Sequence, residues 1–308
     1  MRRINSVSLI GLGAIGAAYG SKLQNLLGDS LTVVANKERI ERYQSTGLKV
    51  NDDVFYFNYQ LPKTSTAPAD LVIFAVKNAE LNQAIEEVKS HIGPNTIILS
   101  LLNGISSEED IYEATKNEHI LYSMCVGIDA VRNNTSTRYS SLGKICYGDK
   151  NQCLSSDVLA LKDLFDDAHI AYEIADNIWH TIWAKFMFNV GINQTSAVLR
   201  APYGIFQNTP LAYEWAESAM YEVVAISQKV GVQLTEEDMT LYRPILHNLS
   251  PNGKTSMLQD MEAGRKTEVE YFAGKVCALG RKFNVPTPVN DQLYKVIQIM
   301  EEITKYHK

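Results

Sequence analysis

The sequence predicts an α/β protein in which an N-terminal domain with a doubly wound sheet is followed by an all-helical C-terminal domain. In the first half of the chain, short apolar runs typical of strands alternate with amphipathic segments. This alternation implies a parallel sheet with right-handed crossovers. From Asn177 onward, nearly every segment has a helical pattern instead. A chain of 308 residues is expected to form about two domains. We place the boundary near Ala175, which gives domains 1–175 and 176–308.

The first domain is expected to open with a strand at Val7–Ile10 and a helix at Ala14–Leu27. Continuous apolar runs are typical of strands that are buried on both faces. The runs that predict further strands are Leu31–Ala35, Leu71–Val76 and Thr96–Leu102. The segment Arg132–Tyr147, rich in Asn, Ser, Thr and Tyr, predicts hairpin strands at the end of this domain. The helices expected in the second domain are Trp183–Leu199, Leu211–Val230, Met257–Phe283 and Asp291–Tyr306.

Composition restricts the class of partner. Hydrophobic residues make up 45% of the chain and charged residues 21%, as in a packed protein. The net charge of −6 provides no basic field for nucleic acid or for an anionic membrane surface. No apolar run reaches the ~18 residues of a membrane span, and no signal peptide is expected. The four cysteines and six histidines are scattered, which predicts reduced thiols in a cytoplasmic protein and no metal site.

A glycine-rich turn follows the first expected strand and opens the first expected helix. Gly11-Leu12-Gly13-Ala14-Ile15-Gly16 fits the pattern G-x-G-x-x-G. In a dinucleotide-binding turn, the first glycine allows the bend, the second lets the backbone approach the pyrophosphate, and the third lets the helix pack on the sheet. Free N–H groups at the helix start then bind the pyrophosphate. We predict that all six residues belong to a dinucleotide site; a purely structural turn is the alternative.

The residues after the second strand select between nicotinamide cofactors. An acidic residue there would bind the ribose 2′-hydroxyl of NAD. This chain has Asn36 at that place, and Lys37 and Arg39 follow. Both cations could reach a 2′-phosphate, so the sequence favours NADP, as NADPH, over NAD. Alternatively, Lys37 and Arg39 are solvated surface charges.

Polar residues also follow two later strands. Lys77 follows Phe74-Ala75-Val76, and Asn103 follows Leu101-Leu102. Ligands of open parallel sheets bind beyond the carboxyl ends of the strands. We therefore expect both residues to face the nicotinamide end of the cofactor, although each one alone also fits an exposed helix start or a turn.

One apolar helix carries a polar stripe. Lys185, Asn189 and Asn193 are spaced four residues apart and share a helix face, and every residue between them is apolar or glycine. Burying these groups without partners would cost several kcal/mol, so we expect a substrate between the two domains to face them. Desolvation would lower the pKa of a buried Lys185, which would ready it as a general acid toward a carbonyl oxygen. The alternative is a structural network in which Lys185 pairs with a carboxylate.

These motifs, in this order, resemble the ketopantoate reductase family over nearly the whole chain. Besides the glycine turn and the Lys185 helix, the matching segments are Phe74–Lys77, Leu102–Gly104, Lys254–Asp260 and Gly264–Glu270. The resemblance implies a Rossmann-like NADP-binding domain at 1–175 and a helical substrate and catalytic domain at 176–308. It also implies reduction of 2-ketopantoate to pantoate with NADPH, a step towards pantothenate and coenzyme A.

The resemblance also implies roles for single residues. Lys185 would be the general acid, and Glu268 would be a catalytic residue that binds the hydroxyl of the substrate and contributes to the cofactor site. Lys77 would contact the cofactor. Hydrogen bonds to the substrate or to the nicotinamide ribose would come from Asn103, Asn189, Asn193 and Ser256. The residues alone do not separate Glu268 from Glu270, because on a helix the two would flank the buried face almost symmetrically.

Two positions depart from the family pattern. Many members have an arginine where Asn36 stands, which leaves NAD open as the cofactor. Many have an asparagine where Tyr203 stands, which leaves the 2-ketoacid substrate open. The alternatives are an NAD-linked 2-hydroxyacid dehydrogenase for another branched or aromatic 2-ketoacid and, from another class, a dinucleotide sensor without a reaction of its own. Amphipathic C-terminal helices permit a homodimer.

Overall fold

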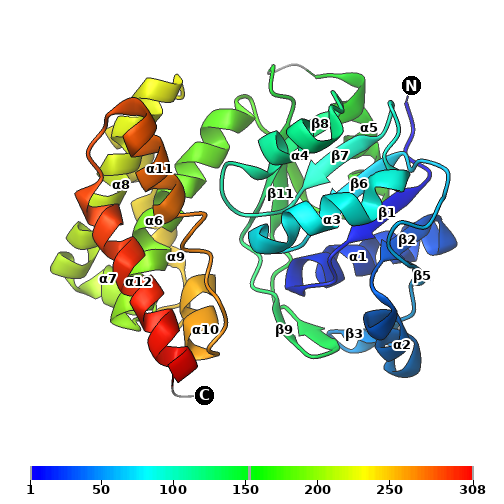
Figure 1. Ribbon diagram of the computed structural model, residues 1–308, viewed down its shortest axis with the longest axis horizontal. Helices are drawn as coiled ribbons and strands as arrows, with labels where there is room; N and C mark the ends of the chain where they lie inside the picture. The colour runs from blue at the N-terminus through cyan, green and yellow to red at the C-terminus, as the bar shows by residue number, and fades with distance from the viewer. Residues whose placement is uncertain (1, 152–153, 307–308) are drawn as a thin grey trace. The chain divides into compact units, whose positions relative to one another are not determined.

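The computed structural model describes residues 2–151 and 154–306 (Figure 1). The chain divides into two compact units, Met1–Ile178 and Trp179–Lys308. The first unit combines sheets with helices, and the second is helical, as the predicted fold class requires. The expected boundary near Ala175 lies just ahead of the first long helix of the second half, α6, which begins at Ile178.

The larger sheet of the first unit has, within the described residues, eight strands in the order β12-β11-β8-β7-β6-β1-β2-β5. The central strand β1 pairs in parallel with β2 and β6, and β7 pairs in parallel with β6 and β8. Every residue of β1, β6 and β7 is buried, which confirms the prediction of strands covered on both faces. The strands are β1 (Val7–Ile10), β2 (Leu31–Val34), β5 (Asn58–Gln60), β6 (Leu71–Phe74), β7 (Ile97–Ser100), β8 (Ile120–Val126), β11 (Lys144–Gly148) and β12 (Tyr172–Ile174).

Helices cover both faces of this sheet, and each face has its own apolar core. Leu9 belongs to the core that includes residues of α1 (Ala14–Leu27) and α5 (Ser156–Asp167). Its neighbour Ile10 belongs to the core that includes residues of α3 (Leu81–Val88) and α4 (Ser107–Thr115). Successive strand residues point to opposite faces, so the sheet is doubly wound, and the glycine turn that follows β1 lies at its carboxyl edge.

A second, smaller sheet lies beside α2 (Lys37–Thr46) in Figure 1. Its strand order is β4-β3-β10-β9. The antiparallel pair of β9 and β10 confirms a hairpin within Arg132–Tyr147, but β10 also pairs in parallel with β3. The rest of that segment enters the larger sheet as β11, antiparallel to β8. The strands are β3 (Leu48–Val50), β4 (Asp53–Phe55), β9 (Val131–Asn133) and β10 (Ser136–Arg138).

The second unit contains three of the expected helices close to their predicted bounds: α6 (Ile178–Leu199), α8 (Pro210–Val230) and α12 (Pro288–Tyr306). Two further helices were not predicted, α7 (Tyr203–Asn208) and α9 (Glu236–Asn248). A Cβ on Gly191 would lie 2.7 Å from the carbonyl oxygen of Ala216, so α6 and α8 approach closely at this glycine.

The prediction of one helix over Met257–Phe283 is wrong. The chain forms α10 (Ser256–Glu262) and α11 (Ala273–Phe283) with a non-helical segment between them. Gly264 takes a left-handed φ of +62°, and Arg265 N then donates to the carbonyl of Asp260 at 2.8 Å. A glycine in this conformation is a common helix terminator.

Three expectations, on thiols, membrane spans and metal sites, can be compared with the described residues. Cys125, Cys146 and Cys277 are buried and form no disulfide bond within the described residues, and Cys153 lies outside them. In the described part of the chain, no helix combines the length and apolarity that crossing a membrane requires, and no group of three or more His, Cys, Asp or Glu side chains is placed to hold a metal ion.

Candidate functional site

The turn between β1 and α1 has the geometry of a close backbone approach. Gly11 has a φ of +97°, and a Cβ there would lie 2.5 Å from the carbonyl oxygen of Ala75. A Cβ on Gly16 would lie 1.9 Å from the carbonyl oxygen of Gly11. A Cβ on Gly13 would have its nearest neighbour at 3.8 Å. The fold itself therefore requires Gly11 and Gly16, whereas the space in front of Gly13 is left open.

Helix α1 begins without a side-chain cap. Gly13 is the N-cap residue, no side chain accepts a hydrogen bond there, and the first turn contains no acid. Leu12 is buried, and Ala14 and Ile15 are half-buried. Because the first N–H groups of a helix lack intrahelical partners and carry partial positive charge, this helix start can bind the pyrophosphate of a dinucleotide.

The segments that follow β1, β6 and β7 lie side by side at the carboxyl edge of the sheet. Ala75 N donates to the carbonyl of Ile10 at 2.9 Å, and Leu101 N donates to that of Phe74 at 2.8 Å. The structure therefore brings the segments that carry Lys77 and Asn103 together. Lys77 is exposed and Asn103 is half-buried.

Asn78, which the sequence analysis did not single out, links these two segments. Its side-chain amide is buried and donates to the carbonyl of Asn103 at 2.9 Å. The only sequence signal was its position directly after Lys77, at the end of a strand. Asn78 positions the backbone of the loop that carries Asn103.

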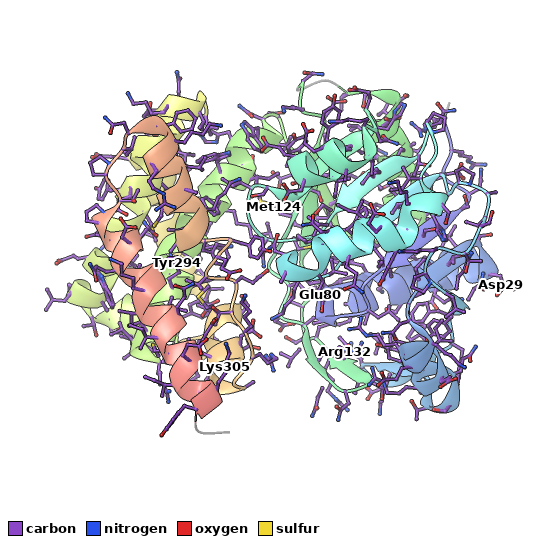
Figure 2. The ribbon with its side chains drawn as sticks, in the orientation of Figure 1. Asp29, Glu80, Met124, Arg132, Tyr294 and Lys305 are labelled. Carbon is purple, nitrogen blue, oxygen red and sulfur yellow. The ribbon has the colours of Figure 1, made fainter. Side chains whose placement is uncertain are left out.

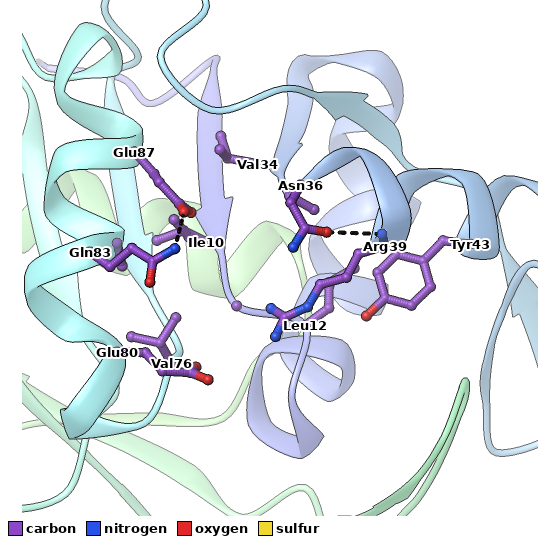
Figure 3. Close-up of a pocket in the computed structure, with 13 residues that line it drawn as sticks. Ile10, Leu12, Val34, Asn36, Arg39, Tyr43, Val76, Glu80, Gln83 and Glu87 are labelled. Atoms are coloured by element: carbon purple, nitrogen blue, oxygen red, sulfur yellow. Dashed lines mark hydrogen bonds between the residues drawn. The ribbon is translucent and has the colours of Figure 1, made fainter.

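A pocket lies beside the glycine turn, with α2 on one side and α3 on the other (Figure 3). Gly11 and Leu12 line it from the turn. On the α3 side, Gln83 donates to Glu87 at 2.7 Å. The α2 side, together with the end of β2, contributes Val34, Ala35, Asn36, Arg39 and Tyr43. Its position beyond the ends of β1 and β2 is where the adenosine half of a dinucleotide lies in a sheet of this kind.

The three residues predicted to select the cofactor differ in placement. Asn36 is the N-cap of α2, and its side-chain oxygen accepts a hydrogen bond from Arg39 N at 2.9 Å. Lys37 is 81% exposed, lies 3.8 Å from a carboxylate oxygen of Glu41, and does not line the pocket. Arg39 does line it. Of the two predicted cations, Arg39 is the one that the fold places at the pocket.

The polar stripe on α6 lies where the helical spacing predicts. From Ile182 to Ala197 every residue is buried except Lys185 and Asn189, which are half-buried. The third member, Asn193, is 7% exposed. Within the described residues, the side-chain amides of Asn189 and Asn193 form no hydrogen bond. Two amides with unused donors and acceptors on an apolar helix can receive a polar ligand.

The start of α10 is tied to the carboxyl end of α6. Thr255 caps α10 by accepting from Leu258 N, and its hydroxyl donates to that of Ser196 at 3.2 Å. Ser196 follows Asn193 by one helical turn. The contact therefore brings the start of α10, where Ser256 is exposed, to the end of α6 that carries the stripe.

Glu268 and Glu270 lie in the turn segment before α11 rather than on a helix, so the expected symmetrical arrangement of the two is wrong. Glu270 is exposed and pairs with Lys266 at 3.1 Å, whereas Glu268 is half-buried. The segment is anchored to α6 because Ala273 N donates to the buried side chain of Gln194 at 2.9 Å. The structure therefore separates the two glutamates, which the sequence alone did not.

A buried acid adjoins the Asn103 loop and was also missed. Glu108 is fully buried, and burial raises the pKa of its carboxyl group to about 7. It accepts from the hydroxyl of Ser107 at 2.8 Å, which in turn accepts from that of Ser100 at 2.8 Å. These contacts join both ends of the 101–106 loop. In the sequence, Glu108 looks like an ordinary first-turn acid of a helix.

Comparisons with known proteins match both halves of the chain. Residues 7–152 match the family described as ketopantoate reductase PanE/ApbA, and residues 177–301 match the family described as ketopantoate reductase PanE/ApbA C terminal. The chain is 26% identical over 301 residues to an uncharacterized oxidoreductase, YkpB, of Bacillus subtilis, covering 95% of this chain and 98% of that protein. It is 25% identical over 301 residues to a 2-dehydropantoate 2-reductase of Streptococcus pyogenes serotype M3, covering 96% and 98%.

Among solved structures, the fold resembles that of D-mandelate dehydrogenase in a ternary structure with NADH and anilino(oxo)acetate. The TM-score is 0.86 at 21% identity, and the alignment covers 97% of this chain and 99% of that chain.

Proposed function

The chain belongs to the ketopantoate reductase family, and on that premise we propose that it reduces 2-dehydropantoate (ketopantoate) to pantoate with NADPH. Members of this family are oxidoreductases that use a dinucleotide cofactor, and the reaction is a step in pantothenate and coenzyme A biosynthesis. When bound, NADPH supplies a hydride to the carbonyl carbon of the substrate.

The first unit fits the dinucleotide. The turn bends at Gly11, which has a positive φ, packs closely at Gly16 and leaves open space at Gly13, which together suit a pyrophosphate. The uncapped start of α1 supplies the N–H groups. In this proposal, residues 1–175 form the cofactor domain. The proposed cofactor contacts come from Gly11, Leu12, Gly13, Ala14, Ile15, Gly16, Asn36, Lys77, Asn103 and Glu268, whereas Lys37 is exposed, does not line the pocket and is left out.

The second unit supplies the proton and most of the substrate contacts. The ammonium group of Lys185 donates a proton to the carbonyl oxygen, which becomes the hydroxyl of the product. Glu268 accepts a hydrogen bond from the hydroxyl that the substrate already carries. The remaining hydrogen bonds to the substrate or the nicotinamide ribose come from Asn103, Asn189, Asn193 and Ser256.

One observation carries this assignment. On an otherwise buried stretch of α6, the two residues that stay half-buried are Lys185 and Asn189, and the amides of Asn189 and Asn193 form no hydrogen bond within the described residues. A scaffold helix would place apolar side chains at these positions, because unpaired amides lower stability. A helix that binds an oxygen-rich substrate needs polar groups there.

A kinetic assay tests the proposal. Purified protein is mixed with NADPH and ketopantoate, and the loss of NADPH absorbance is followed. We expect turnover that saturates with ketopantoate. Turnover only with a bulkier or aromatic 2-ketoacid would refute the substrate assignment. Tight dinucleotide binding with no turnover of any 2-ketoacid would favour the dinucleotide sensor.

A second candidate is an NAD-linked reductase of another 2-ketoacid, and the surroundings of Tyr203 favour it. Tyr203 N donates to the carbonyl of Gly253 at 2.9 Å, and its ring lies 3.0 Å from where a Cβ of Gly253 would stand. Tyr203 thus packs on the loop that leads to Ser256. An aromatic ring beside the proposed substrate residue Ser256 would favour a 2-ketoacid of another shape. A panel of 2-ketoacids with both NADPH and NADH separates the two candidates.

We also propose a homodimer. Helix α12 exposes Val296, Ile299 and Ile303, which share one helix face. Exposed apolar stripes of this kind commonly form the surface that a partner protein contacts. Sedimentation equilibrium of the wild type and of Ile299→Glu checks the assignment, with a monomeric wild type as the contrary result.

A further inference from the structure

Three arginines surround Tyr43 at the α2 wall of the pocket. Arg39 and Tyr43 both line the pocket and are one helical turn apart on α2 (Figure 3). The guanidinium carbon of Arg42 lies 5.4 Å from the centroid of the Tyr43 ring, and that of Arg132 lies 5.6 Å from it. Arg132 comes from β9 of the smaller sheet, far along the chain (Figure 2). Its Nη2 also donates to the hydroxyl of Tyr43 at 3.2 Å.

The positive charge of this group has no acidic partner in the described residues. No carboxylate there lies within 4.0 Å of Arg39, Arg42 or Arg132. Arg132 is half-buried, and its Nη1 is a buried donor without a hydrogen-bond partner among the described residues. Burial lowers the pKa of Arg132, and the charges of Arg42 and Arg39 lower it further. Water could satisfy the N–H group but would leave the charge uncompensated, which is costly in a partly buried site.

Tyr43 connects this charge to the pocket. Its hydroxyl oxygen accepts from Arg132, and its own proton is donated to none of the described residues. A tyrosine hydroxyl can donate one hydrogen bond while accepting another. Tyr43 therefore has a proton to offer to an anion beside Arg39.

We propose that Arg39, Tyr43 and Arg132 form the recognition site for the 2′-phosphate of NADP. The inference rests on the proposed use of NADPH and names the residues that would select it. Arg39 contacts the phosphate from the pocket. Arg132 is a positioning residue, which holds Tyr43 and adds a charge that the phosphate dianion compensates. Asn36 caps the start of α2 and carries no charge. The positive charge of the proposed site therefore comes from Arg39 and Arg132.

The experiment measures binding rather than turnover. Calorimetry with the full chain compares adenosine 2′,5′-bisphosphate with ADP, which lacks the 2′-phosphate. The wild type should prefer the bisphosphate by about tenfold or more, as expected for a charge-assisted contact. Arg39→Ala should remove most of this preference. Arg132→Gln and Tyr43→Phe should each reduce it about fivefold.

Two controls separate recognition from packing. Arg138→Gln removes an arginine from the adjacent strand β10 that is exposed and lies 3.8 Å from Asp52, and it should change nothing. Arg132→Lys retains the charge and should restore part of the preference, which a purely structural role would not do. Preference for the bisphosphate should also fall as salt is added. Tyr43→Phe keeps the ring and tests the site should Arg132→Gln fail to fold.

Equal affinity of the wild type for the two nucleotides would overturn the inference. Full preference retained in both Arg132→Gln and Tyr43→Phe would overturn it as well. Reduction of ketopantoate with NADH and NADPH at equal rates would also refute it, while leaving the reductase assignment intact. Binding of neither nucleotide would refute the proposed function itself.

Discussion

The two units build their candidate sites from different parts of the polypeptide. In the first unit, the glycine turn offers backbone N–H groups and excludes side chains, because a Cβ on Gly16 would lie 1.9 Å from the carbonyl oxygen of Gly11. In the second unit, the stripe on α6 offers an ammonium group and two amides. The first site depends on the path of the chain and the second on functional groups. Substitutions that add side-chain atoms to the glycine turn should therefore impair the first unit. Substitutions that replace the functional groups on α6 should impair the second unit.

The largest expected effect is on the chemistry of the second unit. Lys185→Met removes the proposed proton donor and keeps an unbranched side chain of similar length on a half-buried position. We expect kcat to fall by about 10²- to 10⁴-fold with little change in the free energy of unfolding. Stopped-flow and steady-state assays with ketopantoate measure the change. Lys295→Met, at an exposed position on α12, is the matched control, and a Lys185→Met enzyme within twofold of wild type would disprove the proton-donor role.

In the first unit, the sharpest contrast is between two glycines of one turn. Gly16→Ala forces a Cβ into the backbone of Gly11, and we expect it to lower the free energy of unfolding by about 3 kcal/mol. Gly13→Ala meets no protein atom closer than 3.8 Å, so it should cost less than about 1 kcal/mol yet weaken dinucleotide binding. Urea denaturation and nucleotide titration measure the two quantities. Equal destabilisation by both changes would contradict the structure.

The first unit also contains a functional group whose effect depends on pH. The pKa of Glu108 is raised to about 7 from its ordinary value of 4.5. Between pH 4.5 and pH 7 the folded state retains a proton that the unfolded state has lost, so the free energy of unfolding falls as pH rises. Above pH 7 the loss is complete and amounts to at most about 3 kcal/mol.

Glu108→Gln removes this charge. We expect the variant to be about 1–3 kcal/mol more stable than wild type at pH 8 and to show no such gain at pH 4.5. Glu109→Gln, its exposed neighbour, is the control and should show no pH-dependent difference. A gain that is the same at both pH values would mean that Glu108 is not protonated in the fold.

The smallest expected effect concerns Asn36. Asn36→Ala removes the N-cap of α2 and should cost about 1 kcal/mol. Asn36→Asp keeps a capping oxygen, so stability should be retained. Its added carboxylate should shift the preference from NADPH toward NADH. If Asn36→Asp leaves the ratio of the two affinities unchanged, Asn36 acts only as a cap.

The sequence predicts the elements whose signals are local. The bounds of β1 and α1 match the prediction because an apolar run, a glycine turn and an amphipathic helix follow one another directly. The smaller sheet had no such signal, since Ser136–Arg138 pairs with strand residues near Leu48 that are distant in the chain. Met257–Phe283 was predicted as one helix because Val269, Phe272 and Val276 keep a helical spacing, although Gly264 ends the helix before them.

The same division applies to the site. The exposure of Lys185 and Asn189 could be predicted, because helical spacing alone shows which residues share a face. Asn78, Glu108 and Arg132 could not, because the groups that make them important come from other segments. Arg132, for example, donates a hydrogen bond to Tyr43, which is 89 residues away in the sequence. No residue close to Arg132 in the sequence predicts that its side chain is buried against an aromatic ring.

The positive charge at the start of α1 belongs to peptide groups, which do not titrate. A change of pH can alter the protonation of the substrate, of the adenosine phosphate or of the side chains around them, but it does not alter this charge. Substitution cannot remove it either without redirecting the chain. During evolution, a protein with the proposed site can exchange one 2-ketoacid or one nicotinamide cofactor for another by altering side chains, while the proposed contact with the pyrophosphate persists. We therefore expect lineages of this fold to diverge in what they reduce long before they cease to bind a dinucleotide.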